Sequence, residues 1–152
     1  MKIDRDLYED TILDHNRNPF HYMFLPQNSN HKAYGFNPLC GDEFTINLRI
    51  ADGVIQEAGF EGVGCAISVA STSMMIEVLE GLNMMEATAL AQRMMAFFHG
   101  EVTSSHDAEL PPGQLALLGG VFDHPERIKC ANLAWFILHA ALQKESNTVC
   151  TE

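Results

Sequence analysis

The sequence predicts an α+β fold, in which a small antiparallel sheet of about three strands has helices packed mainly on one face. From Phe44 to Ile50, apolar residues alternate with polar ones, which is typical of a half-buried strand. Asp52-Gly53 follows and favours a tight hairpin into a return strand over 54–61, where Gly59 indicates a bulge. After Gly64 the apolar residues recur at helical spacing, so helices are expected to follow the sheet.

The segment before the hairpin predicts one helix and a long connection. Residues 4–15 have the pattern of an amphipathic helix, which Asn18-Pro19 ends. Residues 20–39 are rich in Asn, Pro and His and predict mainly a loop, with a short edge strand at 33–36. The sheet is therefore expected to begin close to the hairpin.

The second half of the chain predicts three helices. Asn83 and Glu86 have the spacing of a capping box, which starts the second of them. The expected elements are a helix at 67–79, a helix between Asn83 and Gly100, an exposed loop at 101–113, a short helical piece at 115–118 and a final helix at 127–144. We expect one domain over residues 1–152, with 145–152 as a polar, flexible tail.

Composition excludes several classes of partner. The 152 residues include 47% hydrophobic ones, enough to bury a core without help from a metal, and the net charge is −11. An acidic chain argues against nucleic-acid binding and favours encounter with a basic protein patch. No segment reaches the roughly 18 apolar residues of a membrane span, and the start has no signal-peptide pattern. We expect a cytoplasmic protein with reduced thiols.

Three cysteines stand at the ends of predicted elements. Cys40 precedes the first strand, Cys65 lies where the return strand gives way to a helix, and Cys130 lies near the start of the last helix. Asp42 adds a carboxylate, and three thiolates with one carboxylate complete a tetrahedral zinc shell. Their spacing matches no compact zinc-binding pattern. From the residues alone, a shared metal site and three separate buried thiols therefore both remain open.

Other reactive side chains have simpler interpretations. His15, His21 and His31 are candidates to border the site, although scattered histidines are more often surface residues. We interpret Cys150 as a thiol without function in the tail and the methionines of the helices as packing residues. The sequence contains neither a Walker-type lysine nor a dinucleotide fingerprint, so ATP or NAD chemistry has no support.

Three segments resemble the signature segments of the iron–sulfur cluster assembly scaffold family, which comprises the IscU, SufU and NifU N-terminal proteins. They are Asn37-Pro38-Leu39-Cys40-Gly41-Asp42, Phe60 to Ser71, and Arg127-Ile128-Lys129-Cys130-Ala131. The first helix with its Asn18-Pro19 end is also similar to that family, and the resemblance runs from about residue 6 to 144. It implies a SufE/NifU-like α+β fold.

Within this family the chain looks like the SufU branch. Lys129 stands where IscU-type scaffolds carry a histidine, and the stretch between Gly100 and Asp123 looks like the extra segment of SufU proteins. Resemblance to SufU implies a zinc ion held by four ligands, which are Cys40, Asp42, Cys65 and Cys130. It also implies a sulfur acceptor that takes persulfide from a cysteine desulfurase and passes it to downstream cluster assembly proteins.

The same resemblance suggests individual roles. One cysteine is expected to leave the zinc and attack the persulfide, and Cys40 is the acceptor that we favour. Asp42 is the hardest ligand among soft thiolates and the natural place for lability. Arg127 and Lys129 are expected to support the anionic site from a second layer. Two alternatives remain: an IscU-like scaffold that builds a [2Fe–2S] cluster from iron and transfers it to apo-proteins, and a structural zinc domain without sulfur traffic.

Overall fold

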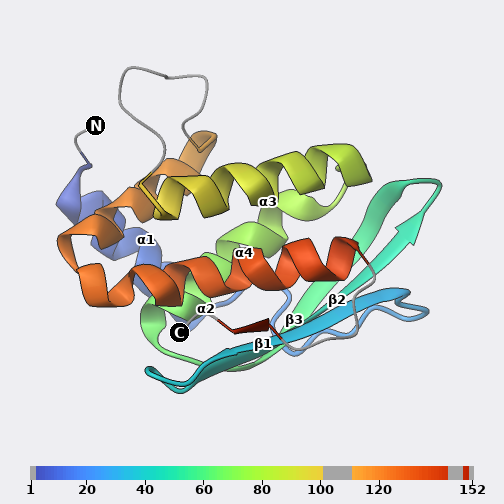
Figure 1. The fold of residues 1–152 in the computed structure, drawn as a ribbon, viewed down its shortest axis with the longest axis horizontal. Helices are drawn as coiled ribbons and strands as arrows, with labels where there is room; N and C mark the ends of the chain where they lie inside the picture. Colours follow the sequence, from blue (N-terminus) through green and yellow to red (C-terminus); the bar gives the residue numbers. More distant parts are fainter. Residues whose placement is uncertain (1–2, 101–110, 144–148, 151–152) are drawn as a thin grey trace.

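The computed structural model describes residues 3–100, 111–143 and 149–150 (Figure 1). The elements in chain order are α1 (Arg5–Arg17), β1 (His31–Asn37), β2 (Asp42–Ala51), β3 (Val54–Val63), α2 (Ala66–Leu79), α3 (Met84–Phe98), the 3₁₀ segments η2 (Gly113–Asp123) and η3 (Pro125–Arg127), α4 (Ile128–Leu142) and β4 (Val149–Cys150). Among the described residues, no helix is long and apolar enough to cross a membrane.

The predicted antiparallel sheet is confirmed. The strands lie in the order β3-β2-β1-β4, and the β1–β2 and β2–β3 pairs are antiparallel. β4 adds a two-residue pairing parallel to β1, where Val149 stands opposite Gly35. This pairing lies in the segment that we expected to be a frayed tail, whereas residues 144–148 and 151–152 lie outside the described part.

The hairpin prediction was right in its turn and wrong in its bulge. Asp52 and Gly53 both have positive φ, as a tight two-residue hairpin turn requires. The register shifts between Arg49 and Ile50 rather than at Gly59, which pairs regularly with Asn47. The glycine at position 59 is needed for a different reason: a Cβ there would run into the backbone carbonyl of Phe24, so the absent side chain lets the 20–24 segment lie directly against β3.

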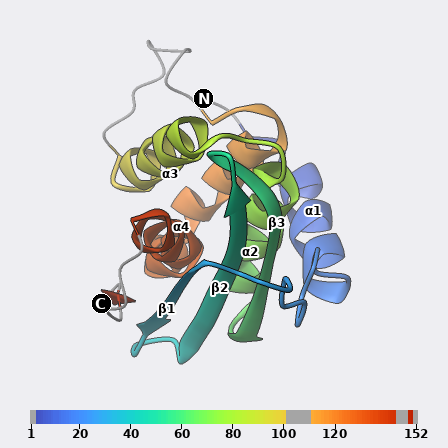
Figure 2. The same cartoon turned by 90° about the vertical axis from the view of Figure 1, so that its right-hand side faces the viewer.

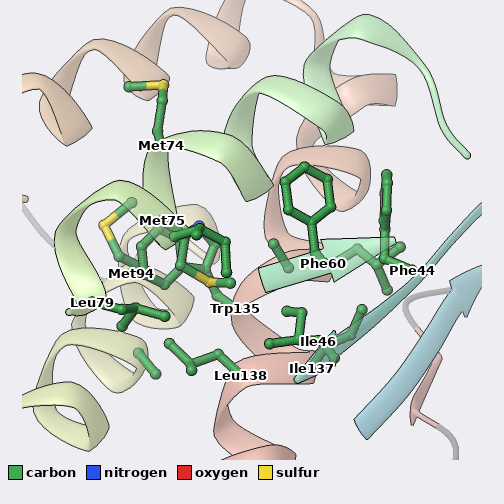
Figure 3. Packing of buried hydrophobic residues seen from close by; sticks show 14 of the residues in the cluster. Phe44, Ile46, Phe60, Met74, Met75, Leu79, Met94, Trp135, Ile137 and Leu138 are labelled. Atoms are coloured by element: carbon green, nitrogen blue, oxygen red, sulfur yellow. The ribbon is translucent and has the colours of Figure 1, made fainter. Parts of the chain in front are cut away.

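Two helices form the layer on the sheet. α4 packs on β1 and β2, α2 packs on β3, and α1 and α3 cover these two helices from outside (Figure 2). α2 is therefore buried on nearly all sides rather than along one stripe, and its hydroxyls find partners inside. Ser71 Oγ donates to the Ala131 carbonyl at 2.7 Å and accepts from Trp135 Nε1 at 3.2 Å. Figure 3 shows Trp135 and Met75 among the buried side chains of this layer.

Two elements are longer than the sequence predicts, because tertiary contacts extend them. The strand expected at 33–36 spans His31–Asn37, and the helical piece expected at 115–118 is the longer 3₁₀ segment η2.

The capping box of α3 is confirmed, because Asn83 and Glu86 each bond the other's backbone N–H. Of the methionines, Met75 and Met94 are buried as expected, whereas Met85 is 81% exposed.

Candidate metal centre

The four predicted ligands arise from three segments that end at the same corner of the fold. Cys40 lies in the turn between β1 and β2, and Asp42 is the first residue of β2. Cys65 is the N-cap of α2, directly after β3, and Cys130 lies in the first turn of α4. Because α2 and α4 both pack on the sheet, their N-terminal turns face the end where β2 begins and β3 ends.

The structure brings three of the four predicted ligand atoms into one group and places Cys65 beside Asp42, outside that group. The ligand atoms of Cys40, Asp42 and Cys130 all lie within 4.8 Å of one another. The Sγ atoms of Cys40 and Cys130 are 2.9 Å apart, and Cys65 Sγ lies 3.9 Å from Asp42 Oδ2. Cys130 is buried, whereas Cys40 and Cys65 are partly accessible. Residues that are 90 positions apart in the chain therefore form one site.

Asp42 holds the start of α2 in place and is also a candidate ligand. Its side chain is only 1% exposed, and Oδ1 accepts a hydrogen bond from the Cys65 backbone N–H at 2.8 Å. This N–H has no partner within the helix, so the carboxylate of Asp42, at the start of β2, caps α2. The second oxygen, Oδ2, faces Cys65 Sγ. One carboxylate thus positions a thiol and contributes a donor atom.

Two polar side chains at the site were missed by the sequence analysis. Asn37, 1% exposed, donates from Nδ2 to Cys40 Sγ at 3.6 Å and accepts the Leu39 N–H at 3.1 Å. Ser68 is fully buried, lies with Oγ 3.6 Å from Cys65 Sγ and donates to the Cys65 carbonyl. An Asn just before a turn and a Ser three residues past a helix N-cap are local signals that would have suggested both.

Gly64 is required by close packing beside these groups. A Cβ at this position would collide with Ser68 Oγ and would lie 2.7 Å from the ring of Phe44 and 3.0 Å from Asp42 Oδ1. The close approach at Gly64 is therefore an approach between atoms of the protein itself. The β3–α2 connection thereby passes directly against Asp42.

Hydrogen bonding among the thiols separates their proton affinities. The Cys130 thiol, together with the N–H and hydroxyl of Ser68, stabilises the Cys65 thiolate against the cost of burial and lowers the pKa of Cys65 to about 6. The same hydrogen bond, followed by burial, raises the pKa of Cys130. Without a metal, the pair therefore holds one proton on Cys130 and a thiolate on Cys65 near neutral pH.

The two predicted supporting bases occupy different places. Arg127 lies at the start of α4, where its hydrogen bond to Cys130 and the charges of Cys65 and Cys40 raise the pKa of its guanidinium. It is thus an anion-stabilising group in contact with the site. Lys129 is exposed on the first turn of α4.

The remaining candidates have other partners or lie elsewhere. His15 Nδ1 bonds Ser73 Oγ at 2.7 Å, and His21 Nδ1 bonds the Ala58 carbonyl at 3.0 Å. His31 Nδ1 bonds Asn30 Oδ1 at 2.8 Å. Within the described part of the chain, the group with metal-ligand spacing contains no histidine. For Cys150 the structure describes the backbone alone, in β4.

The NifU-like N terminal domain family matches residues 7–148. The chain belongs to this family. Its relatives include the Bacillus subtilis protein named zinc-dependent sulfurtransferase SufU, 33% identical over 139 residues that cover 91% of each chain. The Streptococcus pyogenes serotype M1 protein named iron-sulfur cluster assembly scaffold protein IscU is 34% identical over 141 residues, which cover 93% of this chain and 86% of that relative.

Solved structures agree with this family assignment. The crystal structure of FiSufU from Fervidobacterium islandicum AW-1 superposes with a TM-score of 0.75 at 30% identity, over 88% of this chain and 94% of that one. The predicted NifU-like α+β fold is thereby confirmed. Both SufU and IscU names occur among the relatives, so the names by themselves do not separate sulfur transfer from scaffolding.

The donor set of this NifU-like chain fits a zinc ion. The Sγ atoms of Cys40 and Cys130 lie 2.9 Å apart, so they would move apart by about 0.8 Å to reach the roughly 3.7 Å that separates two thiolates on one tetrahedral zinc ion. Three sulfurs and one carboxylate match the preferences of zinc, whereas magnesium and calcium prefer oxygen alone. The same sulfurs also suit iron, so the donor set favours a thiophilic metal without selecting one.

Proposed function

We propose that this protein accepts sulfur from a cysteine desulfurase during iron–sulfur cluster assembly, through a zinc site formed by Cys40, Asp42, Cys65 and Cys130. The observation that carries this proposal is that ligand atoms of Cys40, Cys130 and the buried Asp42 lie within 4.8 Å of one another at a partly accessible corner of the fold, with Cys65 Sγ 3.9 Å from Asp42 Oδ2. The SufU name of the Bacillus subtilis relative supports the zinc and sulfurtransferase roles.

Cys40 is the thiol placed to receive sulfur. It lies in a turn between two strands, beside Leu39, whose side chain is 75% exposed, so a partner can approach it. Cys130 is buried, and the backbone N–H of Cys65 is held by Asp42. The Asn37 amide can donate to a Cys40 thiolate and hold it toward the site. Accessibility thus argues against Cys130, and the contact with Asn37 favours Cys40 over Cys65, which is also partly accessible.

The proposed step is a persulfide exchange. The Cys40 thiolate attacks the outer sulfur of the desulfurase persulfide, a new S–S bond forms on Cys40, and the desulfurase S–S bond breaks. The electron pair of that bond leaves with the desulfurase cysteine as a thiolate, so no external oxidant or reductant is needed. When bound, zinc would keep the thiols deprotonated and protected from oxidation. Arg127, beside Cys130, balances the negative charge that accumulates.

Persulfide labelling tests this proposal. The isolated protein is analysed for metal, then exposed to a cysteine desulfurase and cysteine, and the persulfide is located by mass spectrometry. We expect one zinc per chain and label on Cys40 that Cys40→Ser abolishes. Cys150→Ser is the matched control, because it removes the cysteine that is not among the four proposed ligands and should leave labelling intact. Label that persists in Cys40→Ser would contradict the assignment.

A second candidate function is scaffolding of a [2Fe–2S] cluster on the same residues. The Streptococcus pyogenes relative named as an IscU scaffold supports it, as does a donor set that also suits iron. Reconstitution with iron and sulfide separates the two candidates. A stable cluster chromophore that transfers to an apo-protein recipient would favour the scaffold, whereas zinc retention with stimulated desulfurase turnover would favour sulfur transfer.

A further inference from the structure

The face of the sheet opposite the helices carries a hollow close to the metal centre. Its volume is about 290 Å³. The side chains that surround it are Tyr22, Met23, Tyr34, Glu43, Glu61 and Val63. Glu43 directly follows Asp42, and Val63 lies two residues before Cys65, so the hollow borders the ligand segments from the other side of the sheet.

Strand register explains how the hollow forms. Tyr34, Thr45 and Glu61 lie in one row across β1, β2 and β3, and Glu43 stands opposite Val63 in the next row. Side chains alternate between faces along a strand, so these residues point away from the core face that holds Phe44 and Ile46. Thr45 forms the floor of the hollow, because its side chain is shorter than those of the tyrosines and glutamates around it.

A separate segment closes the open edge of the hollow. Residues 20–24 run beside β3, where the Met23 N–H donates to the Phe60 carbonyl. The Tyr22 hydroxyl donates to the Gly62 carbonyl at 2.9 Å, which fixes its ring at the rim. Tyr22 on the β3 side and Tyr34 on the β1 side thus form two aromatic walls.

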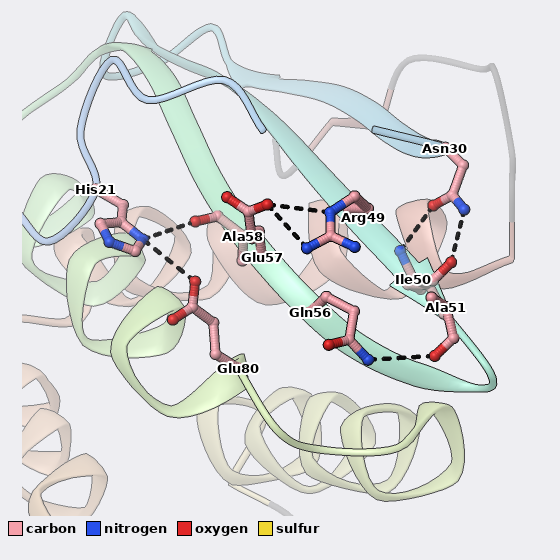
Figure 4. A network of polar contacts seen from close by, with 9 residues as sticks. All are labelled: His21, Asn30, Arg49, Ile50, Ala51, Gln56, Glu57, Ala58 and Glu80. Atoms are coloured by element: carbon pink, nitrogen blue, oxygen red, sulfur yellow. Dashed lines mark hydrogen bonds and ion pairs between the residues drawn. The ribbon is translucent and has the colours of Figure 1, made fainter. Parts of the chain in front are cut away.

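The carboxylates in the hollow have no cationic partner among the residues that the structure describes. The Tyr34 hydroxyl donates to Glu43 Oε2 at 3.1 Å, and among the described residues neither Glu43 nor Glu61 forms an ion pair. The far end of the same face differs, because Arg49 binds Glu57 at 2.9 Å (Figure 4). The two carboxylates without an ion pair, Glu43 and Glu61, therefore lie at the end of this face nearest the metal centre.

The rim of the hollow has the composition of a protein-binding site. Met23 is 61% exposed, Val63 60% and Tyr22 40%, although all three are large and apolar or aromatic. Tyrosine and methionine are enriched at protein interfaces, and contiguous exposed apolar side chains mark interaction surfaces. A net charge of −11 favours a basic partner over an acidic one.

We propose that this hollow receives an arginine side chain of a partner protein. A guanidinium stacks on aromatic rings and binds carboxylates with several N–H groups, so it matches both the tyrosine walls and the two glutamates. A lysine ammonium would use the charges but not the flat walls. The apolar rim would cover the residues that flank the arginine. The inference goes beyond the proposed function and holds whether the metal centre carries sulfur or a cluster.

A peptide titration tests the proposal on the full chain. The probe is the capped peptide Gly-Leu-Arg-Leu-Gly, compared with its neutral counterpart in which citrulline replaces arginine. Amide chemical shifts of ¹⁵N-labelled protein report where each peptide binds. We expect shifts at the residues that line the hollow. The citrulline peptide should bind at least about five-fold more weakly than the arginine peptide, because it lacks the charge.

Matched variants separate a specific site from general electrostatics. Glu61→Gln and Glu9→Gln change the net charge equally, but Glu9 is exposed on α1, away from the hollow. Only Glu61→Gln should weaken binding of the arginine peptide, by about three-fold or more. Equal binding of the two peptides, shifts centred elsewhere, or no shifts at millimolar peptide would each overturn the proposal. Concentration-dependent shifts of the same amides without peptide would assign the hollow to a second copy of the chain and would also overturn it.

Discussion

Replacing Asp42 separates its structural role from its role as a metal ligand. The carboxylate is buried, and Oδ1 accepts the Cys65 N–H at 2.8 Å. Asp42→Ala deletes this acceptor and leaves the N–H of a helix terminus unsatisfied. Asp42→Asn keeps an oxygen at the same position and removes the negative charge. The two variants therefore differ in the hydrogen bond, while both lose the carboxylate.

The magnitude follows from this single contact. A hydrogen bond to a charged group contributes about 1.5–3 kcal/mol, and a buried unsatisfied donor costs a similar amount. We expect Asp42→Ala to lower the free energy of unfolding of the metal-free protein by about 2 kcal/mol. For a chain of this size, that corresponds to a fall in Tm of roughly 4–8 °C. Asp42→Asn should cost less than about half of this, because the neutral bond survives.

Thermal unfolding of the reduced, chelator-treated protein measures the difference. Asp52→Asn is the control, since it removes the same charge from an exposed hairpin turn where asparagine tolerates positive φ. It should stay within about 0.5 kcal/mol of the parent chain. Equal melting temperatures for Asp42→Ala and Asp42→Asn would refute the view that the bond to Cys65 stabilises the fold. Metal content measured in parallel then reports the ligand role separately.

Three further predictions concern the same corner of the fold. Gly64→Ala should lower stability by about 1–3 kcal/mol in a thermal melt, because the added Cβ meets Ser68 and Phe44; an unchanged Tm would contradict this. Asn37→Ala should slow persulfide uptake on Cys40 more than it lowers Tm, since it removes the donor to that sulfur; normal uptake would show that the amide only shapes the turn. In the metal-free protein, alkylation of Cys65 should rise with pH through about 6 and level off above neutrality, because its pKa is lowered. Peptide mapping by mass spectrometry measures that rate, and a ten-fold increase between pH 7 and 8 would indicate an ordinary thiol.

Features that depend on neighbouring residues were predictable from the sequence. The Asp52-Gly53 turn and the Asn83 capping box are local, because their hydrogen bonds and backbone angles involve residues a few positions apart. The alternation of β2 also predicted its buried face correctly. Propensity and periodicity act over this same short range, so these elements were recognisable without tertiary information.

Features that depend on distant contacts were missed or mislocated. β1 is longer than expected because pairing with β2 holds polar residues such as His31 and Lys32 in the sheet. β4 exists through a parallel pairing with β1, more than 100 positions away in the chain. Gly59 was interpreted as a bulge, although the carbonyl of Phe24 is what demands it. Tertiary packing overrides local preference at each of these positions.

The sequence by itself determined which residues are candidate ligands, because Cys40, Cys65 and Cys130 stand at predicted element ends beside family-like segments. Only the tertiary structure decided that these thiols lie near Asp42, that the carboxylate caps α2 by binding the Cys65 N–H, and that the Asn37 amide donates to the Cys40 sulfur. It also decided that Glu43 and Glu61 stand together on the outer face. The physical reason is the separation along the chain over which each feature is determined. Turns and helix caps depend on residues a few positions apart. The burial of side chains, the pKa of the thiols and the meeting of the ligands arise only when helices pack on the sheet and bring distant segments within a few ångströms.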